Sequence, residues 1–282
     1  MTECGVCFRH CRLEDGQIGF CGGRVAKNGR TEAFNYGRIT SLALDPIEKK
    51  PLRRFYPGSR ILSVGSFGCN LRCPFCQNYE ISWSEEAKRF AQTADTVSPE
   101  ELAALAASYT RKGNIGIAFT YNEPLIGYEF VRDTAKLARA SGLKNVLVTN
   151  GTAELSVLEE LRPYIDAMNI DLKGFTDRYY QKVLGGSRKQ VLSFIEEAVK
   201  TCHIELTTLI VPGENDSEEE MRELSQWVSR LNNPDGESVP LHVSRFFPQF
   251  HMTDRLPTEV RTVRHLASVA GESLEYVYTG NC

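Results

Sequence analysis

The stretch SFGCNLRCPFCQN, residues 66–78, contains three cysteines with the spacing C-x3-C-x2-C: Cys69, Cys73 and Cys76. Structural zinc sites and iron–sulfur clusters usually have four protein ligands. A site with three protein ligands leaves one metal position open to a molecule that is not protein, as in catalytic zinc sites. The spacing therefore predicts a cubane cluster with one iron free to chelate a small molecule.

The composition of the 282-residue chain allows one large core, because 41% of the residues are hydrophobic. The net charge of −3 is spread over interleaved acids and bases, so we expect no nucleic-acid partner. No apolar run approaches the roughly 18 residues that span a bilayer, which predicts a cytoplasmic protein without membrane association. The nine clustered cysteines favour reduced, metal-binding thiols over disulfides.

From about residue 60 onward, short apolar segments alternate with helical patterns. Six segments are rich in β-branched and aromatic residues and are predicted strands: RILSVGSF (60–67), IGIAFTY (115–121), KNVLVTN (144–150), AMNIDLK (167–173), HIELTTLIV (203–211) and PLHVSRFF (240–247). The alternation predicts a parallel α/β sheet with right-handed crossovers. Six units are fewer than the eight of a complete barrel, so an open barrel and a doubly wound sheet both fit.

Polar residues follow several of the predicted strands directly. Asn122 and Glu123 follow the second strand, Asn150 ends the third and Lys173 ends the fourth. Ligands of parallel α/β proteins bind at the carboxyl ends of the strands. We therefore expect these residues and the three cysteines to share one site.

A second cysteine cluster lies in a glycine-rich segment at the start of the chain. Its spacing is C-x2-C-x3-C-x9-C, formed by Cys4, Cys7, Cys11 and Cys21. Four thiolates close a coordination shell, which predicts a structural zinc ion or an auxiliary 4Fe-4S cluster. His10 is an alternative ligand. Residues 1–59 are thus predicted to form this segment and a connector, and residues 60–282 the α/β domain.

The motif with Phe75 before the last cysteine resembles the signature of the radical S-adenosylmethionine (radical SAM) superfamily. Further motifs resemble those of the glycyl-radical-enzyme activases, such as the pyruvate formate-lyase activating enzyme: TYNEP (120–124), VTNG (148–151), DLK (171–173) and TTLIVPGEND (207–216). With LALDPIEKKPL (42–52), FYPGS (55–59) and the cysteine-rich start, the chain most resembles the AmmeMemoRadiSam group.

This resemblance implies a partial (βα)6 TIM-like barrel with a small N-terminal cysteine-rich segment. It also implies that Cys69, Cys73 and Cys76 hold three irons of a 4Fe-4S cluster, whose fourth iron takes S-adenosylmethionine. Reductive cleavage would then give methionine and a 5′-deoxyadenosyl radical, which abstracts hydrogen from a substrate. Such chemistry is anaerobic and needs an electron donor such as flavodoxin or ferredoxin.

The resemblance further implies a set of residues in contact with S-adenosylmethionine: Phe75, Asn122, Glu123, Thr149, Asn150, Asp171, Lys173 and Thr207. Asp171 and Lys173 alternate along one strand and therefore face the same side of the sheet. A structural role remains the alternative: an ion pair for Asp171 and Lys173, a surface carboxylate for Glu123, and an ordinary turn for Thr149 and Asn150. Several activases have an aspartate where this chain has Val148, so their cation site is not expected here.

Alternative functions remain open from the residues alone. An activase would act on a glycyl radical protein, whereas the AmmeMemoRadiSam group implies a MEMO-like protein partner and an unassigned substrate. A zinc-ribbon binding module explains only residues 4–21. Dithiol redox catalysis at Cys73 and Cys76 leaves Cys69 without a role.

Overall fold

The computed structural model describes residues 1–84, 86–87, 89 and 96–282. Within these residues the main sheet has eight strands in sequence order, and only β5 and β6 pair in an antiparallel manner. The strands are β5 (Ser41–Pro46), β6 (Arg60–Gly65), β7 (Asn114–Phe119), β8 (Lys144–Thr149), β9 (Ala167–Asp171), β10 (His203–Ile210), β11 (Leu241–Arg245) and β12 (Val277–Gly280).

The strand order separates the two architectures that the sequence left open. A doubly wound sheet reverses its strand order at a switch point, whereas here each parallel strand lies beside the preceding one. Consecutive order is that of a TIM barrel, and the sheet ends at β5 and β12 without closing. The predicted partial barrel is confirmed, and β12 adds one more parallel strand to the six predicted.

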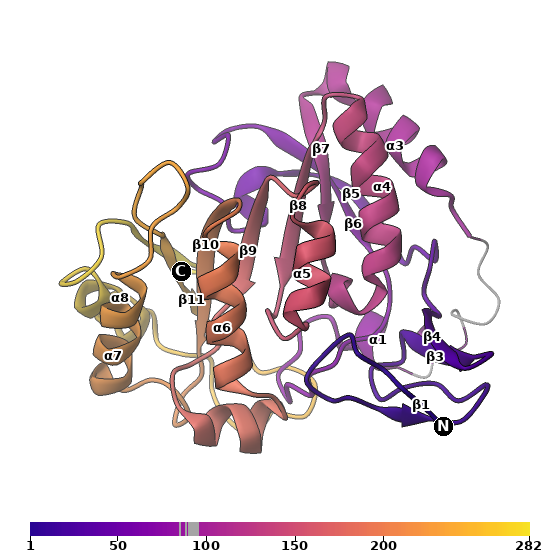
Figure 1. Ribbon diagram of the computed structural model, residues 1–282. Helices are drawn as coiled ribbons and strands as arrows, with labels where there is room; N and C mark the ends of the chain where they lie inside the picture. Colours follow the sequence, from indigo (N-terminus) through magenta and orange to yellow (C-terminus); the bar gives the residue numbers. More distant parts are fainter. Residues whose placement is uncertain (85, 88, 90–95) are drawn as a thin grey trace.

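The helices cover one face of this sheet (Figure 1). They are α3 (Pro99–Ser108), α4 (Tyr128–Ala140), α5 (Leu155–Leu161), α6 (Arg188–Ala198), α7 (Glu218–Val228) and α8 (Val260–Ala270). The short helix α1 (Tyr79–Ser82) lies beyond the ends of the strands instead. Short turns of other helix types are η1 (Ile47–Lys49), η2 (Thr110–Lys112), η3 (Pro124–Gly127) and η4 (Tyr179–Leu184). The Ser98 and Ser217 side chains cap two of these helices, since they accept hydrogen bonds from backbone N–H groups of α3 and α7.

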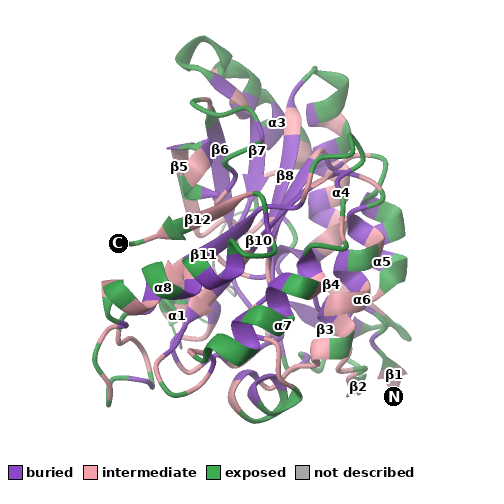
Figure 2. Ribbon diagram, turned by 90° about the vertical axis from the view of Figure 1, so that its left-hand side faces the viewer, coloured by how far each residue is buried: buried purple, intermediate pink, exposed green. Residues whose placement is uncertain are grey.

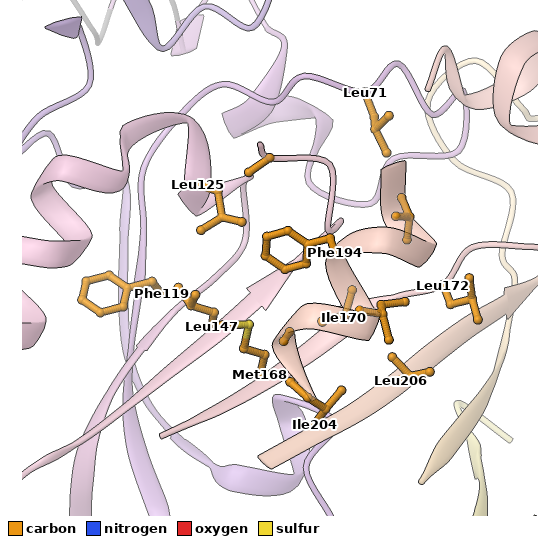
Figure 3. Packing of buried hydrophobic residues seen from close by; sticks show 14 of the residues in the cluster. Leu71, Phe119, Leu125, Leu147, Met168, Ile170, Leu172, Phe194, Ile204 and Leu206 are labelled. Atoms are coloured by element: carbon orange, nitrogen blue, oxygen red, sulfur yellow. The ribbon is translucent and has the colours of Figure 1, made fainter. Parts of the chain in front are cut away.

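The main core lies between the sheet and these helices. Alternate residues of the strands point toward the helices, such as Leu147 in β8, Met168 and Ile170 in β9 and Ile204 in β10. Figure 3 shows Phe194 of α6 packed among them. Figure 2 shows the strands buried and the outer surfaces of the helices exposed, so the helices are amphipathic covers.

The connector fills the inside of the curved sheet near the amino ends of the strands. Ile47, Leu52 and Phe55 form a separate apolar cluster with inward-facing residues of β6 to β9, including Ile61 and Val146. The connector also contributes β5 to the main sheet. The connector therefore packs against the inner face of the sheet through this cluster.

The N-terminal segment folds as two hairpins, β1 (Thr2–Glu3) with β2 (Arg12–Leu13) and β3 (Arg24–Lys27) with β4 (Arg30–Ala33). Figure 1 shows β1, β3 and β4 beside α1, the helix that follows the three-cysteine loop. The segment therefore adjoins the carboxyl ends of the parallel strands. Among the described residues, no helix has the length and apolar character needed to cross a bilayer.

Candidate active site

The three-cysteine loop connects β6 to α1 and lies at the carboxyl end of β6. Cys73 is buried, whereas Cys69 and Cys76 are partly buried. Gly68 precedes the first cysteine with a left-handed φ of 87°, a conformation that favours glycine. The backbone N–H of Cys76 donates to the Cys73 carbonyl at 3.2 Å, which folds the end of the loop into a turn.

The three thiols lie close enough to influence one another. Burial raises the pKa of Cys73 to about 11, Lys173 lowers it, and the neighbouring Cys76 thiol raises it. Burial likewise raises the pKa of Cys69, with further increases from Glu123, Cys73 and Cys76. These shifts favour protonated thiols until a metal replaces the protons.

The donor chemistry fits an iron–sulfur cluster. In the part of the chain that the structure describes, no three His, Cys, Asp or Glu side chains are arranged closely enough to hold a metal ion. Three thiols on one loop nevertheless provide the soft ligands that iron–sulfur clusters require. N–H donors also face Cys69: Leu71 N lies 3.5 Å from its Sγ and Asn150 Nδ2 lies 3.6 Å from it.

Glu123 follows β7 and is 2% exposed. Its Oε1 accepts from Thr149 Oγ1 at 2.7 Å and from Leu125 N at 3.0 Å, and its Oε2 accepts from Asn150 N at 2.8 Å. Burial raises the pKa of Glu123 to about 7, and these hydrogen bonds oppose the increase. Glu123 and Thr149, two predicted cofactor contacts, are thus brought together at the ends of β7 and β8.

Asn150 links this carboxylate to the cysteine loop. Besides the contact with Cys69 Sγ, its Nδ2 donates to Asn70 Oδ1 at 2.9 Å. Its Oδ1 accepts from Thr152 N at 3.1 Å, which fixes the turn after β8. Asn150 therefore contacts the Cys69 thiol and holds the cysteine loop at the same time.

Asn122 has a positioning role in the structure. Its Oδ1 accepts from Ser66 N at 3.0 Å, and its Nδ2 donates to the carbonyls of Phe67 and Gly68 at 3.1 and 3.2 Å. The polar atoms of its side chain are all used in these contacts. Asn122 thus fixes the backbone that leads to Cys69, and its contact with S-adenosylmethionine stays a prediction.

Asp171 and Lys173 form an ion pair, with Lys173 Nζ 2.8 Å from Asp171 Oδ2. Burial lowers the pKa of Lys173, but Asp171, Cys73 and Cys69 raise it more, so its pKa lies well above the ordinary value. The pair reaches the cysteine loop from β9, on the side predicted from the alternation. A permanent cation here offsets the negative charge that three thiolates would bring.

Two predicted cofactor contacts, Phe75 in the cysteine loop and Thr207 beside Asp171 in the sheet, have partners within the protein. Phe75 is buried and packs edge-to-face against Phe246, with ring centroids 6.2 Å apart. Thr207 donates to Asn169 Oδ1 at 2.9 Å, on the inner side of the sheet. Both have structural partners, and their contact with S-adenosylmethionine stays a prediction.

Sequence reasoning missed two asparagines of the site. Asn70, between Cys69 and Cys73, donates to Thr152 Oγ1 at 2.8 Å and accepts from Asn150. Asn215 donates to the Lys173 carbonyl at 2.7 Å and accepts from Val211 N at 2.7 Å. Asn70 lies in SFGCNLRCPFCQN and Asn215 in TTLIVPGEND, two motifs quoted above. The signal that could have identified them is the presence of an asparagine, a side chain that both donates and accepts hydrogen bonds, inside each motif.

The structure also brings the N-terminal cysteines together. Cys4, Cys7, Cys11 and Cys21 line one cavity. His10 does not line it and pairs with Glu154 at 3.2 Å instead. Of the remaining cysteines, Cys202 is buried and Cys282 is exposed.

A partial parallel barrel with three thiols on the loop after β6 is the arrangement expected of an enzyme that binds an iron–sulfur cluster. The model of the Radical SAM superfamily matches residues 63–225, more than half of the chain. The chain therefore belongs to the radical SAM superfamily and is an enzyme.

Two relatives show the range of similarity. Uncharacterized protein MJ0808 from Methanocaldococcus jannaschii is 40% identical over 283 aligned positions, which cover 99% of this chain and 81% of that protein. Pyruvate formate-lyase 1-activating enzyme from Escherichia coli is 26% identical over 193 positions, covering 66% of this chain and 75% of that enzyme.

Solved structures share the fold at low identity. Streptococcus suis SuiB bound to S-adenosylmethionine has a TM-score of 0.57 at 12% identity, covering 79% of this chain and 52% of that one. TYW1 with a lysine-pyruvate adduct bound has a TM-score of 0.56 at 15% identity, covering 85% of this chain and 87% of that one.

Proposed function

We propose that the protein is a radical SAM enzyme of the AmmeMemoRadiSam type, acting on a substrate still to be assigned. The observation that carries this proposal is the loop of Cys69, Cys73 and Cys76 at the carboxyl end of β6, within the region that matches the superfamily. When bound, the cluster supplies an electron that cleaves S-adenosylmethionine to methionine and a 5′-deoxyadenosyl radical.

The residues of this chain hold and orient the reactants. Glu123 is the carboxylate proposed to bind the ammonium of S-adenosylmethionine, and its contacts with Thr149 and Asn150 fix its orientation. Three of the four lone-pair positions of the carboxylate already accept hydrogen bonds, which leaves one on Oε2 for a further donor. The ammonium would therefore share the carboxylate with the groups that already bind it. The Asp171–Lys173 pair supplies a carboxylate and an ammonium near the cysteine loop.

Binding of S-adenosylmethionine to the reduced cluster tests this proposal. We expect its addition to change the electron paramagnetic resonance (EPR) spectrum of the anaerobically reduced protein. The Asp171→Asn variant should require a higher concentration, because a charged hydrogen-bond partner is lost. An unchanged spectrum at saturating S-adenosylmethionine would contradict the proposal.

An activase function is the second candidate, favoured by the similarity to the pyruvate formate-lyase 1-activating enzyme. The N-terminal cysteines and Val148 favour the AmmeMemoRadiSam type, for which a MEMO-like protein is the proposed partner. Flavodoxin or ferredoxin is the proposed electron donor in either case.

The two candidates differ in the species that carries the radical. The reduced enzyme, S-adenosylmethionine and a glycyl radical protein would be mixed without oxygen. A doublet EPR signal on the partner would support the activase function. No signal is expected for an enzyme of the AmmeMemoRadiSam type.

A further inference from the structure

The cavity at the N-terminus is lined by thiols from two parts of the segment. Cys4, Cys7 and Cys11 come from the β1–β2 hairpin, which the hydrogen bond from Cys4 N to the Cys11 carbonyl holds at 2.9 Å. Cys21 comes from the following glycine-rich loop. Three of these thiols are buried and Cys11 is partly buried, so they do not form a surface cluster.

Arg24 shows that this cavity lacks an acceptor. The residue lines the cavity and is 3% exposed. Its Nη1 pairs with Glu129 at 2.7 Å and its Nη2 donates to the Thr31 carbonyl at 3.0 Å. Its Nε is buried and has no hydrogen-bond partner among the described residues. A buried donor without an acceptor is costly, and a thiolate ligand of a bound metal is an acceptor of the required kind.

The charges around the cavity also fit a metal–thiolate centre. Four thiolates with one Zn²⁺ ion carry a net charge of −2, and Arg9 and Arg24 both line the cavity. The segment contains few apolar residues of its own, so tetrahedral thiolate coordination would supply folding free energy that its core does not. An iron–sulfur cluster uses the same four thiols.

Backbone contacts connect this cavity to the three-cysteine loop. Cys69 N donates to the Cys21 carbonyl at 3.0 Å, so a ligand of each proposed centre shares one hydrogen bond. A Cβ atom on Gly68 would lie 2.5 Å from the same carbonyl oxygen, which shows how closely the two loops approach.

Two arginines reinforce the connection. Arg9 Nε donates to the Asn70 carbonyl at 2.7 Å, and Arg72 donates to the Phe20 carbonyl at 2.7 Å. Both guanidinium groups lie against the ring of Phe20, at 3.5 and 3.7 Å from its centroid. The segment around Cys21 is therefore packed directly on residues 69–72.

We propose that Cys4, Cys7, Cys11 and Cys21 bind a second metal centre, with Zn²⁺ as the expected occupant, and that this centre positions the loop carrying Cys69. The proposal does not depend on cleavage of S-adenosylmethionine. It therefore predicts that the N-terminal cysteines bind metal even in a variant whose three-cysteine loop has lost its thiols.

Metal analysis of a full-length variant tests the site. In the background Cys69→Ala, Cys73→Ala and Cys76→Ala, we expect about one zinc per chain, and adding Cys11→Ser should remove it. Adding Cys282→Ser is the matched control and should leave the metal content unchanged. About four irons in place of zinc would support the four-thiolate centre and overturn Zn²⁺ as its occupant. A metal-free background variant that is folded by circular dichroism would overturn the site.

Arg24→Lys tests the role of the unpartnered donor, because lysine keeps the charge and removes Nε. We expect roughly 10- to 100-fold weaker metal affinity in competition with a chelator, the usual effect of losing a group that orients a ligand. Unchanged affinity would show that Arg24 does not contact the centre.

Hydrogen exchange of the wild-type protein tests the coupling of the two loops. Removing the N-terminal metal with a chelator should speed amide exchange in residues 66–76, the Cys69 amide included. Peptides of α7, far along the chain, serve as the internal control. Exchange of residues 66–76 that is the same with and without the N-terminal metal would overturn the positioning role.

Discussion

At the scale of single residues, Glu123 shows why a carboxylate is required. Its two oxygens accept three hydrogen bonds, and glutamine would place an NH₂ group against one of those donors. We expect Glu123→Gln to lower the free energy of unfolding by about 1–3 kcal/mol, the cost of a buried unsatisfied group. Denaturant unfolding at equal metal content measures it, and unchanged stability would show that the hydrogen bonds rearrange freely.

Asn150 is expected to tune the cluster through its N–H contact with Cys69 Sγ. Hydrogen bonds to the sulfur ligands raise the reduction potential of iron–sulfur clusters, because they stabilise the added electron. Asn150→Ala should therefore shift the potential to more negative values in an EPR-monitored titration. Thr152→Val is the control, since it removes the hydroxyl that accepts from Asn70 and donates to Asn150 without removing the donor to sulfur. An equal shift in both variants would refute a direct effect on the sulfur.

At the scale of elements, Gly68 joins the two cysteine segments. Alanine at a left-handed φ costs about 1–2 kcal/mol, and this cost applies equally to Gly58, which has a φ of 81° and nothing near its Cβ position. The clash with the Cys21 carbonyl applies only to Gly68. We expect Gly68→Ala to lower the free energy of unfolding by about 1–3 kcal/mol more than Gly58→Ala does. Equal losses of unfolding free energy in the two variants would mean that the loops of Gly68 and Cys21 can move apart without a free-energy cost.

The connector gives a pH-dependent prediction through Glu205 of β10. Burial would raise the pKa of Glu205, but hydrogen bonds from His203, His242 and the N–H groups of Arg53 and Arg54 lower it to about 2. Because the pKa is lower in the folded protein, the stabilisation is present above the ordinary value near 4.5 and is lost as the pH falls toward 2.

The change in pKa corresponds to about 3 kcal/mol of stability. The wild-type protein should therefore lose about this much more unfolding free energy than Glu205→Gln between about pH 5 and pH 2. The comparison of the two proteins removes any common effect of acid on metal binding. If the unfolding free energies of the two proteins fell in parallel with pH, the hydrogen bonds from the histidines and the connector would not hold the pKa of Glu205 low.

At the scale of the whole molecule, periodicity predicted the alternating strands and helices, and short motifs predicted groups of site residues that are close in the sequence. The alternation along β9 placed Asp171 and Lys173 on one side, and the structure pairs them. The antiparallel strand β5 was not predicted, because its pairing with β6 is a tertiary contact across the connector. The contact between Cys21 and Cys69 is a single backbone hydrogen bond between loops, for which a sequence carries no periodic signal.

The most direct test of the account is release of 5′-deoxyadenosine from S-adenosylmethionine by the anaerobically reconstituted and reduced protein. We expect release by the wild-type protein and none by Cys76→Ala, which lacks one ligand of the proposed three. A wild-type protein that contains a full cluster and releases none, or equal release by Cys76→Ala, would contradict the central claim.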